Sequence, residues 1–75
     1  MRYFFDIRDD FYSADDADGE ELSGIDAAHR EAVKVATSIA GDVFVAEGFE
    51  ITVTVRDEER PIFEVSVNLN RKDLA

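Results

Sequence analysis

The side chains best suited to chemistry in this 75-residue chain are a single histidine and a run of acids. There is no cysteine, and His29 has no second histidine beside it, so the usual ligands of a zinc site are missing. A general base also needs an orienting partner and a nucleophile within reach. Asp26, three residues before His29, offers only an ordinary pair on a helix surface. We therefore interpret His29 as a structural residue.

The acidic loop at residues 15–22 is a candidate for binding a cation. Asp16, Asp18 and Glu20 alternate beside Gly19, in a pattern that resembles part of an EF-hand loop. With Gly19 at the sixth loop position, however, Ala14 stands where the first ligand belongs and Ile25 where the bidentate glutamate belongs. Both ends of the pattern lack ligands, so we interpret the segment as a solvated loop. Asp16, Asp18 and Glu20 are candidates for loose divalent binding only.

The other reactive side chains do not form a recognisable catalytic pattern. None of the serines lies in a Gly-x-Ser-x-Gly setting, and the four glycines are scattered instead of forming a phosphate-binding loop. The adjacent acids Glu58 and Glu59 fall in an expected turn, with no cleft implied. The sequence therefore predicts a protein that is not an enzyme and that binds no cofactor.

The charge balance narrows the class of partner. The formal net charge is −10, which disfavours nucleic acid and anionic membrane surfaces, because both are bound mainly by lysine and arginine. An acidic surface favours solubility or basic protein partners. No signal-like or membrane-length apolar run is present, so we expect a cytoplasmic protein.

The elements that position these residues follow from hydrophobic spacing. Apolar residues three or four apart predict one helix over residues 24–47, with its stripe facing a core; the stripe comprises Ile25, Ala28, Ala32, Val35, Ala36, Ile39 and Val43. Alternation over residues 50–69 predicts a hairpin of two strands joined by a polar turn. Residues 71–75 read as a frayed tail.

The N-terminal segment predicts a strand with an aromatic residue on its second face. Tyr3, Phe5 and Ile7 alternate with polar residues, but Phe4 breaks the alternation. A short second strand is expected within residues 11–14. These aromatics could stack on bases, yet the basic groove that such binding needs is missing. We retain Phe4, Phe11 and Tyr12 as candidate contact residues for a protein partner.

Together these elements predict a single α+β domain spanning residues 1–75. The expected order is β-(β)-α-β-β, with an antiparallel sheet of three to four strands and the helix packed on one face. A small open sheet leaves unpaired backbone groups at its margins, and a chain with a small core can cover them by pairing with itself. We therefore expect a homodimer, although the sequence does not indicate which strand or face would be used.

Several segments together suggest a family. The opening RYFFDIRD, the loop DADGEEL, the alanine-rich helix and the later run VRDE resemble a group of short alphaproteobacterial proteins of unknown function. The order of elements also resembles the HicB-like antitoxin domain, a likeness at fold level only. The family resemblance implies the fold and a bacterial cytoplasmic setting. The missing catalytic pattern and the open sheet edges predict a non-enzymatic protein-interaction or self-association module. The alternative is an antitoxin-like regulator that binds a basic protein.

Overall fold

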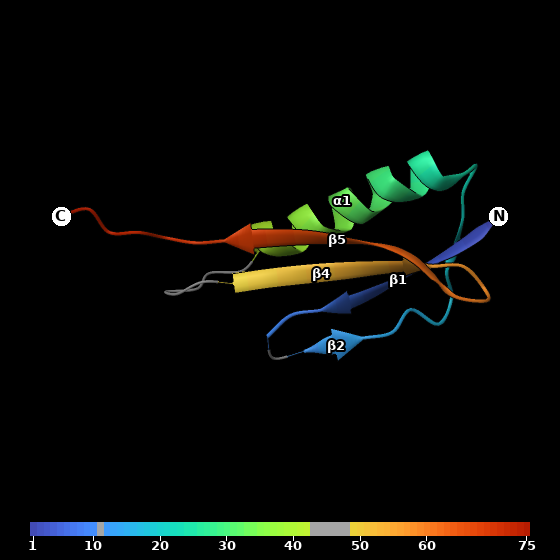
Figure 1. Cartoon of the computed structure of the whole chain (residues 1–75), viewed down its shortest axis with the longest axis horizontal. Coiled ribbons are helices and arrows are strands. Elements are labelled where there is room, and N and C mark those ends of the chain that lie inside the picture. Colours follow the sequence, from blue (N-terminus) through green and yellow to red (C-terminus); the bar gives the residue numbers. More distant parts are fainter. Residues whose placement is uncertain (11, 43–48) are drawn as a thin grey trace.

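The computed structural model describes residues 1–10, 12–42 and 49–75. It contains one helix and one antiparallel sheet of five strands, so the predicted α+β class is confirmed. The elements are β1 (Arg2–Arg8), β2 (Ser13–Ala14), β3 (Glu20–Glu21), α1 (Ile25–Asp42), β4 (Phe49–Arg56) and β5 (Pro61–Leu69). Residues 70–75 have no regular secondary structure and extend past the end of β5 (Figure 1).

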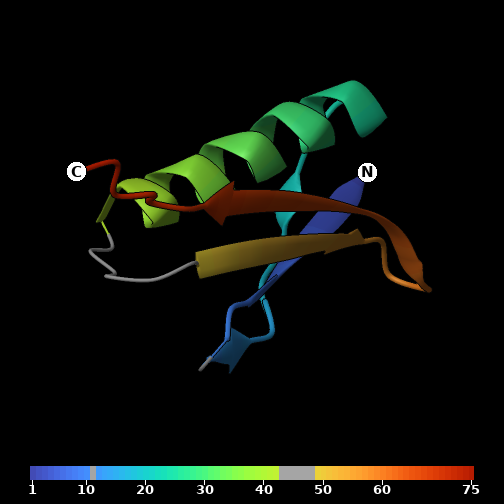
Figure 2. The same cartoon turned by 60° about the vertical axis from the view of Figure 1, so that its left-hand side comes forward.

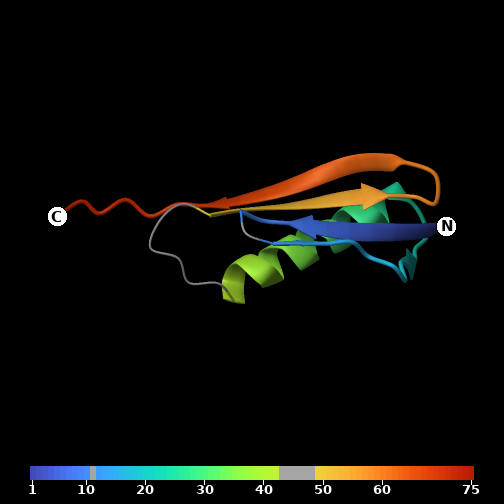
Figure 3. The same ribbon diagram turned by 90° about the horizontal axis from the view of Figure 1, so that it is seen from below.

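The sheet has the strand order β2-β1-β4-β5, and β3 pairs with the start of β1. Strand β4 is central, since it pairs with β1 through Phe5↔Val55 and with β5 through Val53↔Val65. The helix covers one face of this sheet, and the other face carries no second layer in the described part of the chain (Figure 3). Figure 2 shows α1 running obliquely above β4 and β5.

Small side chains bring the helix close to the sheet. Ala28, Ala32 and Ala36 are completely buried, and they face the equally buried aliphatic side chains of β4. An alanine presents only a methyl group, so the helix backbone can approach the strands closely and the layers pack at the density of a protein interior. The core comprises Tyr3, Phe5, Ala28, Ala32, Ala36, Phe49, Ile51, Val53 and Val55.

One detail of the predicted helix differs in the structure. Ile25 was expected in the core but is 54% exposed, because it is the first residue of α1 and lies at the margin of the contact with the sheet. The described helix, Ile25–Asp42, lies within the predicted range 24–47. Residues 43–48, including the predicted core residue Val43, lie outside the described residues.

The sheet has one strand more than the three to four predicted. The additional strand, β3, lies inside the segment that we predicted as an entirely solvated loop. Its two glutamates pair with Arg2 and Tyr3 of β1, although both glutamate side chains remain exposed. The polar sequence is typical of a loop, and only the pairing with β1 makes it a strand.

No helix in the described residues is long and apolar enough to cross a membrane.

Candidate functional site

The acidic loop is held against β1 by the Asp16 carboxylate. Its Oδ2 accepts a hydrogen bond from the backbone N–H of Phe5 at 3.1 Å. Its Oδ1 accepts from the N–H groups of Asp18 and Gly19, also at 3.1 Å. Strands β2 and β3 pair with β1 on either side of this point, so the carboxylate satisfies a β1 donor that has no strand partner there.

Arg56 joins the same loop to the centre of the sheet. Its Nε donates to Asp6 Oδ2 and its Nη2 donates to the carbonyl of Asp16, both at 2.7 Å. Asp6 in turn accepts from the backbone N–H of Asp16 at 2.9 Å. The guanidinium also lies 4.5 Å from the centroid of the Phe4 ring, a cation–π distance. We call Phe4, Asp6, Asp16 and Arg56 the loop anchor.

The loop anchor also explains the acidity of Asp16. Partial burial alone would raise the pKa of this carboxyl group. The backbone donors Gly19, Phe5 and Asp18, followed by the positive charge of Arg56, outweigh burial and hold the pKa of Asp16 below its usual value. The carboxylate therefore stays ionised in the folded protein because it binds the chain's own backbone.

Gly19 is required by both backbone conformation and space. Its φ is +71°, in the left-handed region that residues with a Cβ rarely adopt. A Cβ at this position would lie 2.8 Å from Cε1 of Phe4 and 3.0 Å from Cγ of Arg2. The glycine therefore lets the loop close over the Phe4 ring.

We expect Gly19→Ala to destabilise the domain by about 1–2 kcal/mol, from the left-handed conformation and the contact with Phe4. The matched control is Gly41→Ala in α1, where an added Cβ meets nothing within 4 Å and alanine favours the helix by about 1 kcal/mol. Chemical denaturation of both variants measures the two changes. Equal stabilities for the two variants would contradict this account of Gly19.

The three candidate metal ligands do not converge. The Asp16 carboxylate binds backbone donors, Asp18 contributes its main chain to Asp16 and Arg2, and the Glu20 side chain is exposed on β3. Among the described residues, no group of three or more His, Cys, Asp or Glu side chains could hold a metal ion. The DADG run is thus accounted for by a self-capping turn.

The residues predicted to contact a protein partner differ in how far the structure describes and exposes them. Phe4 lies on the bare face of the sheet but is half-covered by Gly19 and Arg56, which explains the broken alternation in β1. Tyr12 is 62% exposed next to β2. Phe11 lies outside the described residues. His29 is exposed on α1, with its ring 6.1 Å from that of Phe63 in an edge-on contact.

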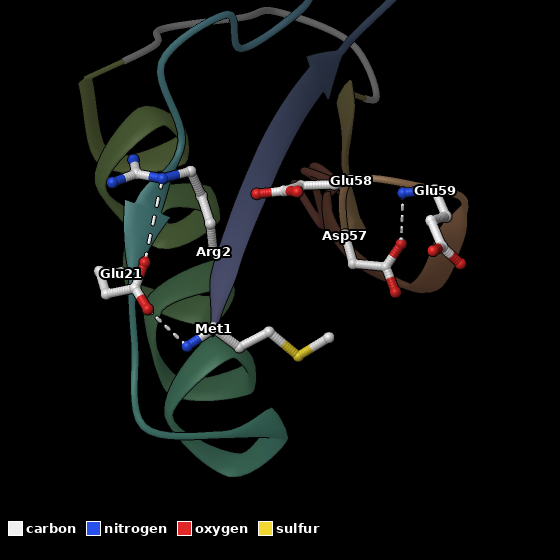
Figure 4. Close-up of a pocket in the computed structure, with 6 residues that line it drawn as sticks. All are labelled: Met1, Arg2, Glu21, Asp57, Glu58 and Glu59. Carbon is white, nitrogen blue, oxygen red and sulfur yellow. Dashed lines mark hydrogen bonds and ion pairs between the residues drawn. The ribbon is translucent and has the colours of Figure 1, made fainter.

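A charged depression lies between the N-terminal end of β1 and the β4–β5 turn (Figure 4). Its cations are already engaged, since the Met1 amino group lies 2.6 Å from Glu21 and Arg2 lies 3.9 Å from the same carboxylate. Asp57 accepts from the N–H groups of Glu59 and Arg60, and these bonds lower the pKa of Asp57. The depression is therefore lined by engaged cations, a capped turn and the carboxylates of Glu58 and Glu59, and none of its lining residues form a nucleophile and base in contact.

The longest unpaired strand edge in the described part of the chain is the outer edge of β5. This nine-residue strand ends the order β2-β1-β4-β5 and pairs only with β4 in the described part of the chain. Glu64 is its one charged residue. Pro61 and the bulge at Val55/Arg56 interrupt pairing only at the turn end, so the centre of the strand lacks the features that commonly protect an edge.

Sequence reasoning missed Asp6 and Arg56 as anchoring residues. They lie 50 positions apart, and only the β1–β4 register places them together on the bare face. The alternation indicated that face for each residue separately. Their opposite charges on two expected strands were the available signal, but using it required knowing that those two strands are neighbours.

Comparison with known protein families gives a match over most of the chain. The pattern of DUF6894, a domain of unknown function, matches residues 2–68. The chain belongs to the DUF6894 family. This match includes the whole loop anchor and all of β5 except its last residue, so both features lie within the family domain. No curated protein and no solved structure matches the chain.

Proposed function

We propose that this DUF6894 domain is a non-enzymatic protein-interaction module that binds a partner by adding a strand to the outer edge of β5. In this mode of recognition the backbone hydrogen bonds supply affinity, and alternate side chains supply specificity. The observation that carries the proposal is the nine-residue edge strand with one charge and no outer partner in the described residues.

Apolar side chains around the edge support the proposal. Large hydrophobic residues that are exposed in the described chain include Ile62 and Leu69 of β5 and Ile25 and Val33 of α1. Buried strand contacts typically combine backbone pairing with such apolar neighbours. The opposite margin of the sheet offers less, because β2 and β3 are two residues each and the acidic loop lies between them.

The test is to block the edge without touching the core. In the double variant Ile62→Lys/Asn68→Lys, two exposed residues on the bare face of β5 become lysines, which naturally protect strand edges. The control Ser23→Lys/Ser38→Lys adds the same charge at two exposed residues away from β5. Each tagged chain is used to capture binding proteins, and the untagged form of the same chain is among the proteins offered to it. We expect the edge variant to lose binding that the native chain and the control retain.

Retention of the same partners by the edge variant would overturn the proposal. If the edge variant and the native chain capture the same basic protein equally well, the antitoxin-like alternative is favoured. In that alternative the net charge of −10 attracts the partner.

A further inference from the structure

We infer that the strand added to β5 is β5 of a second copy of this chain, in a two-fold dimer centred on Val65. This inference rests on the proposed use of the β5 edge and adds the identity of the partner and the register. It follows from three geometric observations: the side-chain pattern of β5, the position of α1 over the sheet, and the position of Val33 along the strand direction.

The length and the side chains of β5 together favour an antiparallel register centred on Val65. Pairing Val65 with Val65 of the second copy aligns all nine residues of the strand and places Phe63 opposite Val67 on the helix-covered face. On the other face, Glu64 then lies opposite Ser66. Moving the centre to residue 64 would place the two Glu64 carboxylates opposite each other, which is unfavourable. Sliding the second strand by a single residue, so that Glu64 lies opposite Val65, would place the apolar face of one strand beside the polar face of the other.

The position of α1 fits a second helix beside it. The helix packs obliquely on both β4 and β5, so at the point where it crosses between them its axis lies about half a strand spacing inside β5, and one spacing is about 4.8 Å. A two-fold axis at the outer edge lies another half spacing beyond β5. The two helices, both on the same face of the joined sheet, are then separated by about 9.6 Å, within the usual 8–10 Å for packed helices.

Val33 supplies the apolar contact between those helices. His29 contacts Phe63, which identifies the flank of α1 that faces the β5 edge. Helix and strand run in the same direction (Figure 1). One helical turn from His29 to Val33 advances about 6 Å, close to the advance of about 6.6 Å from Phe63 to Val65. Val33, 37% exposed in the single chain, is therefore level with the two-fold axis.

The first test uses the absence of cysteine from the sequence. In the proposed register, directly opposite residues have Cα atoms about 4.5–5.5 Å apart, which a disulfide can bridge. Val65→Cys should therefore form a covalent dimer under mild oxidation. Ser66→Cys is the matched control, because the two residues 66 would be about 8 Å apart, too far for a disulfide.

The second test measures the dimer without cross-linking. Sedimentation of the native chain should show a reversible dimer, and Val33→Asp should raise its dissociation constant at least about tenfold by placing two like charges at the axis. Ser38→Asp, at an exposed position of the same helix, should leave that constant unchanged. Circular dichroism of both variants confirms that the monomer remains folded.

Two results would overturn the inference. One is a native chain that stays monomeric up to about 1 mM. The other is cross-linking that is as efficient from position 66 as from position 65. If either occurs while capture of another protein still depends on the β5 edge, the proposed function stands and its partner is a different chain. If edge-dependent capture is also lost, both the function and the dimer fail.

Discussion

Val53→Asp is expected to leave the chain unfolded. Val53 is completely buried in the central strand β4, between the pairing strands β1 and β5 and beneath α1. An unpaired carboxylate there costs several kcal/mol, while a domain of this size has a stability of only about 4–11 kcal/mol. Circular dichroism should show the loss of helix and sheet together.

Val53→Ala is the control for this substitution, because it removes two methyl groups without introducing charge. It should cost about 1–3 kcal/mol and leave a cooperative unfolding transition. A native-like melting curve for Val53→Asp would show that β4 is not the centre of the core.

Asp16→Ala is expected to destabilise the domain by about 2–3 kcal/mol. The substitution removes a charged acceptor from the N–H groups of Phe5, Asp18 and Gly19, and water at this half-buried site compensates only in part. Asp18→Ala is the matched control, since the contacts described for Asp18 use its backbone and not its carboxylate. Equal losses from the two variants in urea denaturation would contradict the anchoring role of Asp16.

The same carboxylate predicts a dependence of stability on pH. Because folding lowers the pKa of Asp16, the unfolded chain binds the proton more readily than the folded chain does. The stabilisation is complete above about pH 4, the ordinary range of the group, and is lost as the pH falls through the lowered pKa. Asp16→Asn cannot titrate, so its free energy of unfolding should fall less steeply in acid than that of the native chain.

The fold was predictable where the spacing of apolar residues repeats over many positions. The alanine-rich stripe predicts α1, and the alternation around Val53 and Val65 predicts the β4–β5 hairpin, because both patterns report burial along one element. The exposure of Ile25 was not predictable from the stripe. Periodicity gives the direction of a side chain but not where the contact with the sheet ends.

The roles in the candidate site depended on pairing between distant segments. Asp16 looked like a solvated or metal-binding acid because its sequence neighbours are acids. Its hydrogen-bond partner on β1, Phe5, lies eleven positions away, and the Arg56 side chain that donates to its carbonyl comes from β4. Local sequence cannot distinguish a carboxylate that binds a cation from one that binds backbone N–H groups, since both need an oxygen acceptor in a turn.

The unequal margins of the sheet have a consequence for stoichiometry. On the β1 side, a carboxylate occupies the place of a strand, and the segments that flank it are two residues long. Among the described residues, only β5 offers a long unpaired strand edge on which a further chain could extend the sheet. In the dimer proposed above, each chain uses its one open strand edge to bind the other chain, so assembly would end at two subunits. The anchored acidic loop would then prevent a third chain from pairing at the β1 margin, and the sheet could not grow into a fibre.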